Sequence, residues 1–140
     1  MPVKTTTTGP IIKVSPLFDT EGTHLLSLRL PYPPSINNYY GRTRTGRVFI
    51  KAHGKQFRQE VGDLIRPMLL KTLDCRIRLW VEMYPPDRRR RDVDNIKKAL
   101  LDALTHAEVY DDDCLIDDLR VVRGDVVKGG ELTIHLFRLD

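Results

Sequence analysis

The sequence predicts a single α+β domain in which a mixed β-sheet of about four strands packs with two main helices. Apolar and polar residues alternate in residues 26–30 and 75–84, which is the period of half-buried strands. In residues 57–68 and 96–104 apolar residues instead recur every three or four positions, as on one face of a helix. The order strand, helix, strand, helix, strand, strand favours a mixed sheet with helices on it.

Length and composition set further bounds. The chain of 140 residues is long enough to bury one core, and its formal net charge of +4 fits a polyanionic partner. Its apolar runs are shorter than the ~20 residues of a membrane span, and its start lacks the order of a signal peptide. Cys75 and Cys114 stand apart without a CxxC pattern, so we expect a reducing, cytoplasmic location.

The N-terminal third contains one clear element. Residues 1–24 lack periodicity and predict a flexible lead, with a short strand at residues 11–14 as the alternative. The domain itself is expected to span residues 25–140. Its first strand, residues 26–30, is ended by a proline-rich stretch, because proline cannot donate to a strand ladder.

Residues 35–47 predict a loop, because they mix small polar residues and glycines with two tyrosines and three arginines. Two interpretations stay open. Arg42, Arg44 and Arg47 could hold DNA phosphates while the tyrosines stack on unpaired bases. Alternatively, the loop is solvated and its tyrosines pack on the domain.

The remaining elements follow in order. Pro67 should kink or end the helix of residues 57–68, because its ring clashes with the preceding turn. Residues 75–84 form the clearest strand, which Pro85 and Pro86 close. The second helix begins near residues 92–95. The later elements are strands at residues 119–122 and 132–137, with a turn at residues 128–130 between them.

A basic run beside an acidic pair carries the chemistry. Arg88, Arg89, Arg90 and Arg91 are consecutive and lead directly into Asp92 and Asp94. Cations attract a polyanion, whereas paired carboxylates repel one unless a metal ion lies between them. The pattern therefore indicates a metal-dependent enzyme that acts on nucleic acid.

Three groups could form its site. Asp92 and Asp94 can converge on one ion, and oxygen ligands favour Mg²⁺ or Mn²⁺ over zinc. Lys98 lies one helical turn after Asp94, where its charge could stabilise a phosphate. Either Asp112 or Asp113 could complete the site from the turn after the helix.

Each group also has a structural alternative. Asp92 or Asp94 could cap the helix, and Asp94 could pair with Lys98 on the surface. The acidic run at residues 111–113 could be an ordinary turn. Asp102 is interpreted as the structural partner of Lys98. These alternatives do not explain why four arginines directly precede the carboxylates.

The segment of residues 86–95 reads PDRRRRDVDN, followed by Lys98, residues 102–105 and residues 112–113. This pattern resembles the RusA-type Holliday junction resolvases. The resemblance also includes the motif LPYPPS at residues 30–35 and residues 37–38, 40, 120–122 and 128–130. The resemblance covers residues 25–137.

The resemblance implies a homodimer that nicks four-way DNA junctions at two symmetry-related positions, in DNA recombination and repair. It implies Mg²⁺ or Mn²⁺ as the cofactor, held by Asp92, Asp94 and Asp113. It also implies an essential Lys98 and a DNA contact at Arg91. The run at residues 111–113 is one acidic residue longer than the family's usual pair, so Asp112 stays open as the third ligand.

Two rival functions are carried alongside junction resolution. One is a non-catalytic protein that binds junctions or other branched DNA. The other is a broader structure-specific nuclease that cuts flaps and forks, because shape selectivity depends on loop geometry and dimer spacing.

Overall fold

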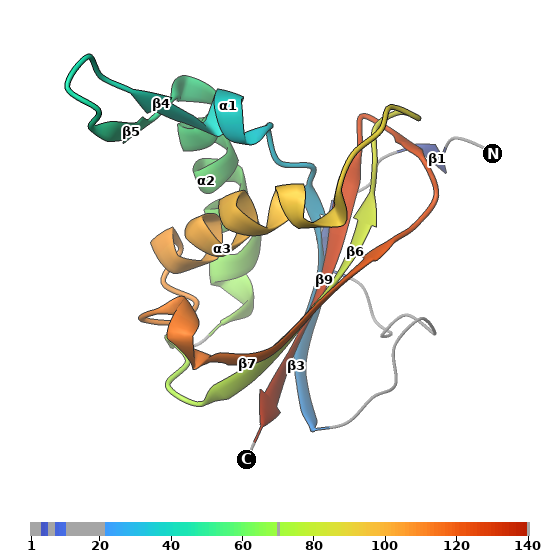
Figure 1. The fold of residues 1–140 in the computed structure, drawn as a ribbon. Coiled ribbons are helices and arrows are strands. Elements are labelled where there is room, and N and C mark those ends of the chain that lie inside the picture. Colours follow the sequence, from blue (N-terminus) through green and yellow to red (C-terminus); the bar gives the residue numbers. More distant parts are fainter. Residues whose placement is uncertain (1–3, 6–7, 11–21, 70, 140) are drawn as a thin grey trace.

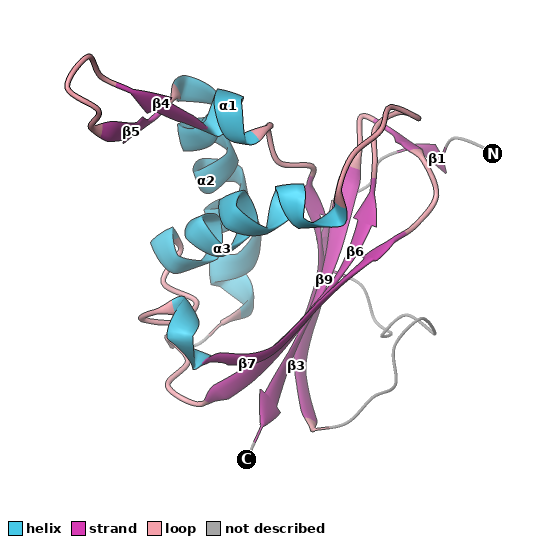
Figure 2. Ribbon diagram, viewed as in Figure 1, coloured by secondary structure: helices cyan, strands magenta, loops and turns pink. Residues whose placement is uncertain are grey.

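A computed structural model describes residues 4–5, 8–10, 22–69 and 71–139 of the chain. Helices gather on one side of a twisted β-sheet (Figure 1), and the same division is clear when elements are coloured by type (Figure 2). The predicted α+β fold is confirmed. The alternative strand at residues 11–14 lies outside the described residues, and the lead over residues 1–24 stays a prediction.

The main sheet has five strands in the order β2-β3-β9-β6-β7, one more than expected. The strands are β2 (Gly9–Pro10), β3 (Thr23–Pro31), β6 (Arg76–Tyr84), β7 (Ile116–Arg123) and β9 (Glu131–Leu139). The four longer strands are those that the sequence predicts, and β2 adds to the edge beside β3. Two further strands, β1 (Lys4–Thr5) and β8 (Val127–Lys128), pair with each other.

The two ends of the sheet differ in strand direction. Strands β3, β9 and β6 are antiparallel neighbours, whereas β6 and β7 run parallel. Parallel strands need a crossover connection, usually a helix, and here it spans residues 85–115. It contains α3 (Lys97–His106) between two short 3₁₀ turns, Val93–Ile96 and Asp113–Leu115. The arginine run, Lys98 and all the acidic candidates therefore lie on one connection.

The core lies between the sheet and the helices. The alternating leucines of β3 are buried, as the period-two pattern predicts, and pack with residues of β6, β9 and both long helices. The helical members are Phe57, Val61 and Ile65 of α2 and Ala99, Leu100, Ala103 and Leu104 of α3. Burying one such Leu or Ile side chain stabilises the fold by roughly 1.5–3 kcal/mol. This packing fixes α3 rigidly over the sheet.

The opposite face of the sheet carries buried polar side chains. Ser27 Oγ hydrogen-bonds to His135 Nδ1 at 2.6 Å, and His135 Nε2 lies 3.2 Å from Glu82 Oε2. Trp80 and Phe137 pack beside them. Since these polar groups satisfy one another away from solvent, this face is structural.

The first long helix, α2 (Ala52–Ile65), begins earlier than the pattern predicts and continues into a 3₁₀ turn, Arg66–Met68. Pro67 lies in that turn, so the predicted end of the helix at this proline is confirmed. Within the described ranges, no helix is long and apolar enough to cross a membrane.

The prediction of a loop for residues 35–47 is wrong for most of this segment. It forms a short helix, α1 (Ile36–Tyr39), and the first strand of a hairpin, β4 (Tyr40–Arg42), which pairs with β5 (Val48–Ile50). The hairpin projects from the body of the domain (Figure 1). Periodicity could not reveal these elements, because each is too short to repeat its pattern often enough to be recognised: alternation is judged over roughly 4–8 residues and helical periodicity over roughly 11–18.

Candidate active site

The arginine run begins with an ordered ion pair. Asp87 accepts hydrogen bonds from Arg91 at 2.5 and 3.1 Å and from the backbone N–H of Arg89 at 2.9 Å. The Arg91 guanidinium, with the Arg89 N–H, lowers the Asp87 pKa to about 2. Arg123 also donates to the Arg91 carbonyl, so this end of the loop is anchored to β7.

The other arginines extend outward. Arg88, Arg89 and Arg90 are exposed, and the Arg89 side chain keeps 82% of its accessible surface although it lies 3.7 Å from Asp87. An exposed guanidinium is accessible to a phosphate and can bind it through two parallel hydrogen bonds. The loop therefore combines one anchored arginine with a cationic outer surface.

Asp92 and Asp94 lie where the loop enters the 3₁₀ turn before α3. Asp92 occupies the N-cap position, but its carboxylate makes no capping hydrogen bond. Both side chains are exposed, and neither forms an ion pair within the part of the chain that the structure describes. The structural alternatives, a helix cap and an Asp94–Lys98 ion pair, are therefore not found among the described residues.

Lys98 projects from the first turn of α3 toward the hairpin. Its ammonium lies 4.8 Å from the centroid of the Tyr40 ring, a cation–π contact. Both residues line a cavity of about 580 Å³ at whose other end lies the acidic turn of residues 111–113. The structure thus brings Lys98 together with Asp112 and Asp113, which are 14 and 15 positions away in sequence.

The two aspartates of the acidic turn differ in environment. Asp112 caps the 3₁₀ turn Asp113–Leu115, and its carboxylate accepts from the Cys114 N–H at 2.9 Å. That bond, with one to Asp113, lowers the Asp112 pKa, whereas the shared hydrogen bond with Asp112 raises the pKa of Asp113. A cation placed here would relieve the repulsion between the two carboxylates.

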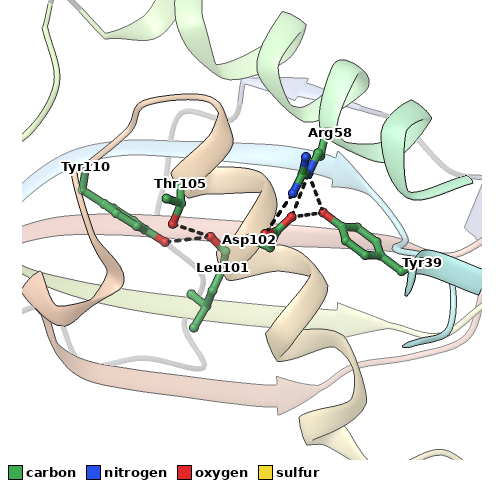
Figure 3. A network of polar contacts seen from close by, with 6 residues as sticks. All are labelled: Tyr39, Arg58, Leu101, Asp102, Thr105 and Tyr110. Carbon is green, nitrogen blue, oxygen red and sulfur yellow. Dashed lines mark hydrogen bonds and ion pairs between the residues drawn. The ribbon is translucent and has the colours of Figure 1, made fainter. Parts of the chain in front are cut away.

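The middle of α3 is held by a polar network (Figure 3). Asp102 accepts from Arg58 of α2 at 2.8 and 3.1 Å and from the hydroxyl of Tyr39. Burial and the Asp102 bond raise the Tyr39 pKa well above its usual value, so the phenol stays a neutral donor. The expected partnership of Asp102 with Lys98 is therefore wrong, because Arg58 and Tyr39 satisfy this carboxylate.

The same figure shows how the acidic turn is tied to the helix. Tyr110 donates to the Leu101 carbonyl at 3.3 Å, and Thr105 donates to that carbonyl at 2.9 Å. Tyr110 is buried and directly precedes residue 111. These contacts fix the turn at the cavity that Lys98 lines.

The predicted residues divide into three places. Lys98, Asp112 and Asp113 share the cavity, whereas Asp92 and Asp94 precede it on the chain and do not line it. Arg42 lines a neighbouring cavity, and Arg44 and Arg47 are exposed on the hairpin turn. Among the described residues, no three acidic, histidine or cysteine side chains form a ready metal cluster. The donor chemistry suits Mg²⁺, but the carboxylates stand in two separate pairs.

Sequence reasoning missed the residues that position the site. Arg58 acts on a residue 44 positions away, and nothing in its helical spacing distinguishes it from a solvated cation. Tyr40 carried a signal, since it follows two asparagines and another tyrosine among cations. Its contact with Lys98 still required the fold, because the two residues are 58 positions apart.

Comparison with known proteins gives a consistent result. The family model described as Endodeoxyribonuclease RusA matches residues 31–136. The crossover junction endodeoxyribonuclease rusA of Enterobacteria phage HK97 is 45% identical over 112 residues, which cover 79% of this chain and 92% of that protein. The proteins of the same name in Escherichia coli K12 and Shigella sonnei are 43% and 44% identical over 111 residues, with the same coverage.

Proposed function

Because the chain belongs to the RusA endodeoxyribonuclease family, we propose that it is a metal-dependent endonuclease that resolves four-way DNA junctions in recombination and repair. The observation that carries this proposal is the cavity that Lys98 and the acidic turn of residues 111–113 both line. Similar proteins named crossover junction endodeoxyribonucleases match over 92% of their length, so the similarity covers nearly the whole enzyme.

We assign a resident Mg²⁺, replaceable by Mn²⁺, to the carboxylates of Asp92, Asp94 and Asp113. Because these stand in two separate pairs among the described residues, the loop that carries Asp92 and Asp94 must approach the acidic turn to complete the site. Two properties support this assignment. Asp92 and Asp94 are exposed and have no protein partner among the described residues, so their oxygens are available to an ion. Asp112 is already engaged as a cap, which favours Asp113 as the third ligand. A bound metal would polarise the phosphate and lower the pKa of a water molecule.

The protein's own cations complete the mechanism. Lys98, held near the Tyr40 ring, offsets the negative charge that develops on the phosphate during hydrolysis. The exposed Arg88, Arg89 and Arg90 hold flanking phosphates. Arg91, with part of its charge compensated by Asp87, orients the loop and makes a DNA contact. Binding of this kind weakens steeply with salt, because each phosphate contact releases counterions.

We also propose that the active form is a homodimer acting on DNA in the cytoplasm. A four-way junction has near-twofold symmetry, and a C₂ dimer presents one site to each of two symmetry-related strands. A monomer would leave single nicks, whereas a dimer makes paired cuts.

The test is cleavage of an end-labelled four-way junction in Mg²⁺ by the natural chain, by Asp94→Asn and by Asp74→Asn. Asp74 is an exposed acid just before β6 and serves as the matched control. We expect paired symmetric cuts by the natural chain and the control, and binding without cutting by Asp94→Asn. Binding without cutting by all three, in Mn²⁺ as well, would make the protein a junction-binding module. Equal cutting of flaps and forks would replace junction resolution with a broader nuclease activity.

A further inference from the structure

A second cavity adjoins the one that faces the acidic turn. It has a volume of about 490 Å³, within the range of ligand sites in proteins, and it shares Tyr40 and Lys98 with the first cavity. The hairpin and α1 supply the rest of its wall. The principal residues are Ile36, Asn37, Arg42, Val48 and Lys51.

The wall of this second cavity has two chemical characters. Arg42, Lys51 and Lys98 make it cationic, whereas Ile36 and Val48 make it apolar. Ile36 and Val48 keep 39% and 49% of their accessible surface, so both have apolar surface available for contact with a ligand. A cationic wall suits a phosphate, and an apolar wall suits the face of a base.

The cavity is a built feature of the fold. The Lys51 ammonium donates to the Asn37 carbonyl at 2.7 Å and so ties α2 to α1. Gly41 allows the Phe49 ring to lie against the hairpin backbone, since a Cβ at this position would stand 2.5 Å from the ring. The strand pairing sets Arg42 opposite Val48 on one side of the hairpin. Lys51 is therefore tied to α1, and Arg42 is a direct cross-strand neighbour of Val48.

We propose that this second cavity binds one unpaired nucleotide of the junction strand, next to the phosphate that is cut. Its base packs on Ile36 and Val48, and Arg42 and Lys51 hold its phosphate. The inference rests on the proposed junction endonuclease, because Lys98, to which that proposal assigns a catalytic role, lines both cavities together with Tyr40.

An unpaired nucleotide fits this cavity better than intact duplex does. Within a duplex each base is stacked on its neighbours and presents only its edges in the grooves. Cationic grooves lined with aromatic side chains are instead typical of sites for single strands, where exposed base faces stack on the protein, and Tyr40 lines this cavity. A strand can supply such a base at the branch point, where stacking between arms is interrupted.

The experiment is a thermodynamic cycle between protein and DNA. Abasic nucleotides are placed singly at the two positions on each side of the cut, and kcat/KM is measured for the natural chain and for an Ile36→Ala/Val48→Ala variant. Loss of a packed base at one position should lower kcat/KM of the natural chain about tenfold, which corresponds to ~1.4 kcal/mol. The same abasic nucleotide should change kcat/KM of the Ile36→Ala/Val48→Ala variant little.

A charge substitution gives an independent readout. Lys51→Gln should weaken junction binding and reduce its salt dependence, whereas Lys55→Gln, one turn along the same exposed helix face, should change neither. Equal effects of the two lysine substitutions would overturn the phosphate assignment.

The outcomes separate this inference from the proposed function. A natural chain that cuts no junction at all would overturn the proposed function. Cleavage whose abasic effects are the same for the natural chain and the variant would overturn the nucleotide site alone. Loss of the dimer in the Ile36→Ala/Val48→Ala variant, measured by sedimentation, would also overturn the nucleotide site. In that case a second copy of the chain covers these two side chains.

Discussion

The acidic side chains before α3 and the acidic side chain in the middle of that helix differ in exposure and in their hydrogen-bond partners. Asp92 and Asp94, before the helix, are exposed and have no ion pair with another described residue. Asp102, in the middle, is satisfied by Arg58 and Tyr39 from two other elements. A paired carboxylate stabilises the fold, whereas an exposed one without an ion pair among the described residues is available to a ligand. The comparison distinguishes the acid that is held in the fold from the acids that we propose as metal ligands.

The largest effect should follow loss of an unpaired acid. We expect Asp92→Asn and Asp94→Asn each to reduce junction cleavage at least about a hundredfold, because each removes a proposed metal ligand. The free energy of unfolding should stay within about 0.5 kcal/mol of its original value, since no partner is left behind. Cleavage rates and urea unfolding curves check both parts. A large loss of stability in either variant would erase the contrast with Asp102.

Lys98→Gln should have the next largest effect. Losing a charge that stabilises the developing phosphate charge lowers catalytic rates by roughly a hundredfold. Among the described residues Lys98 forms a ring contact rather than an ion pair, so stability should change little. Single-turnover cleavage at saturating protein measures the rate separately from binding. An unchanged single-turnover rate would mean that Lys98 serves only to bind DNA.

The acidic turn provides a matched pair of variants. Asp113→Asn should lose cleavage as Asp94→Asn does, whereas Asp112→Asn should keep most of it, because Asn is an equally good cap for the turn Asp113–Leu115. Cleavage assays of the two variants side by side decide which residue is the third ligand. The reverse ranking would assign Asp112 to the metal.

A smaller effect, on stability, is expected at Asp102. Asp102→Asn leaves the partly buried Arg58 guanidinium without its ion pair, so the free energy of unfolding should fall by about 1–3 kcal/mol. Urea unfolding measures this loss, with Asp74→Asn as the exposed control. Metal binding should survive the substitution. A fully stable Asp102→Asn variant would show that the network contributes little to the fold.

The smallest effect concerns Asp87. Its pKa is lowered to about 2 by Arg91, so the ion pair is complete above the ordinary aspartate pKa and is lost only as the pH falls through about 2. The loop should therefore keep its form at all physiological pH values. Titration of the Asp87 carboxyl by NMR should show this midpoint, and Arg91→Gln should return it toward 3.8. An unchanged midpoint in Arg91→Gln would contradict the anchored loop.

The sequence predicted the crossover well and the hairpin poorly, for physical reasons. The strand at residues 75–84 and the stripe of α3 have strong periodicity, and the arginines and acids beside them are adjacent in sequence. The elements of residues 36–50 are too short to show a period, so their cavity wall was interpreted as a loop. The Arg58–Asp102 pair joins two helices, and no local pattern encodes such a contact.

The most direct test of the division between structural and functional acids is metal binding without DNA. Mn²⁺ is titrated into the natural chain, Asp94→Asn and Asp102→Asn. The electron paramagnetic resonance signal of the free ion then gives the amount of metal bound by each protein. We predict a site in the natural chain and in Asp102→Asn that is lost in Asp94→Asn. Equal binding by all three proteins, or loss in Asp102→Asn alone, would contradict the division.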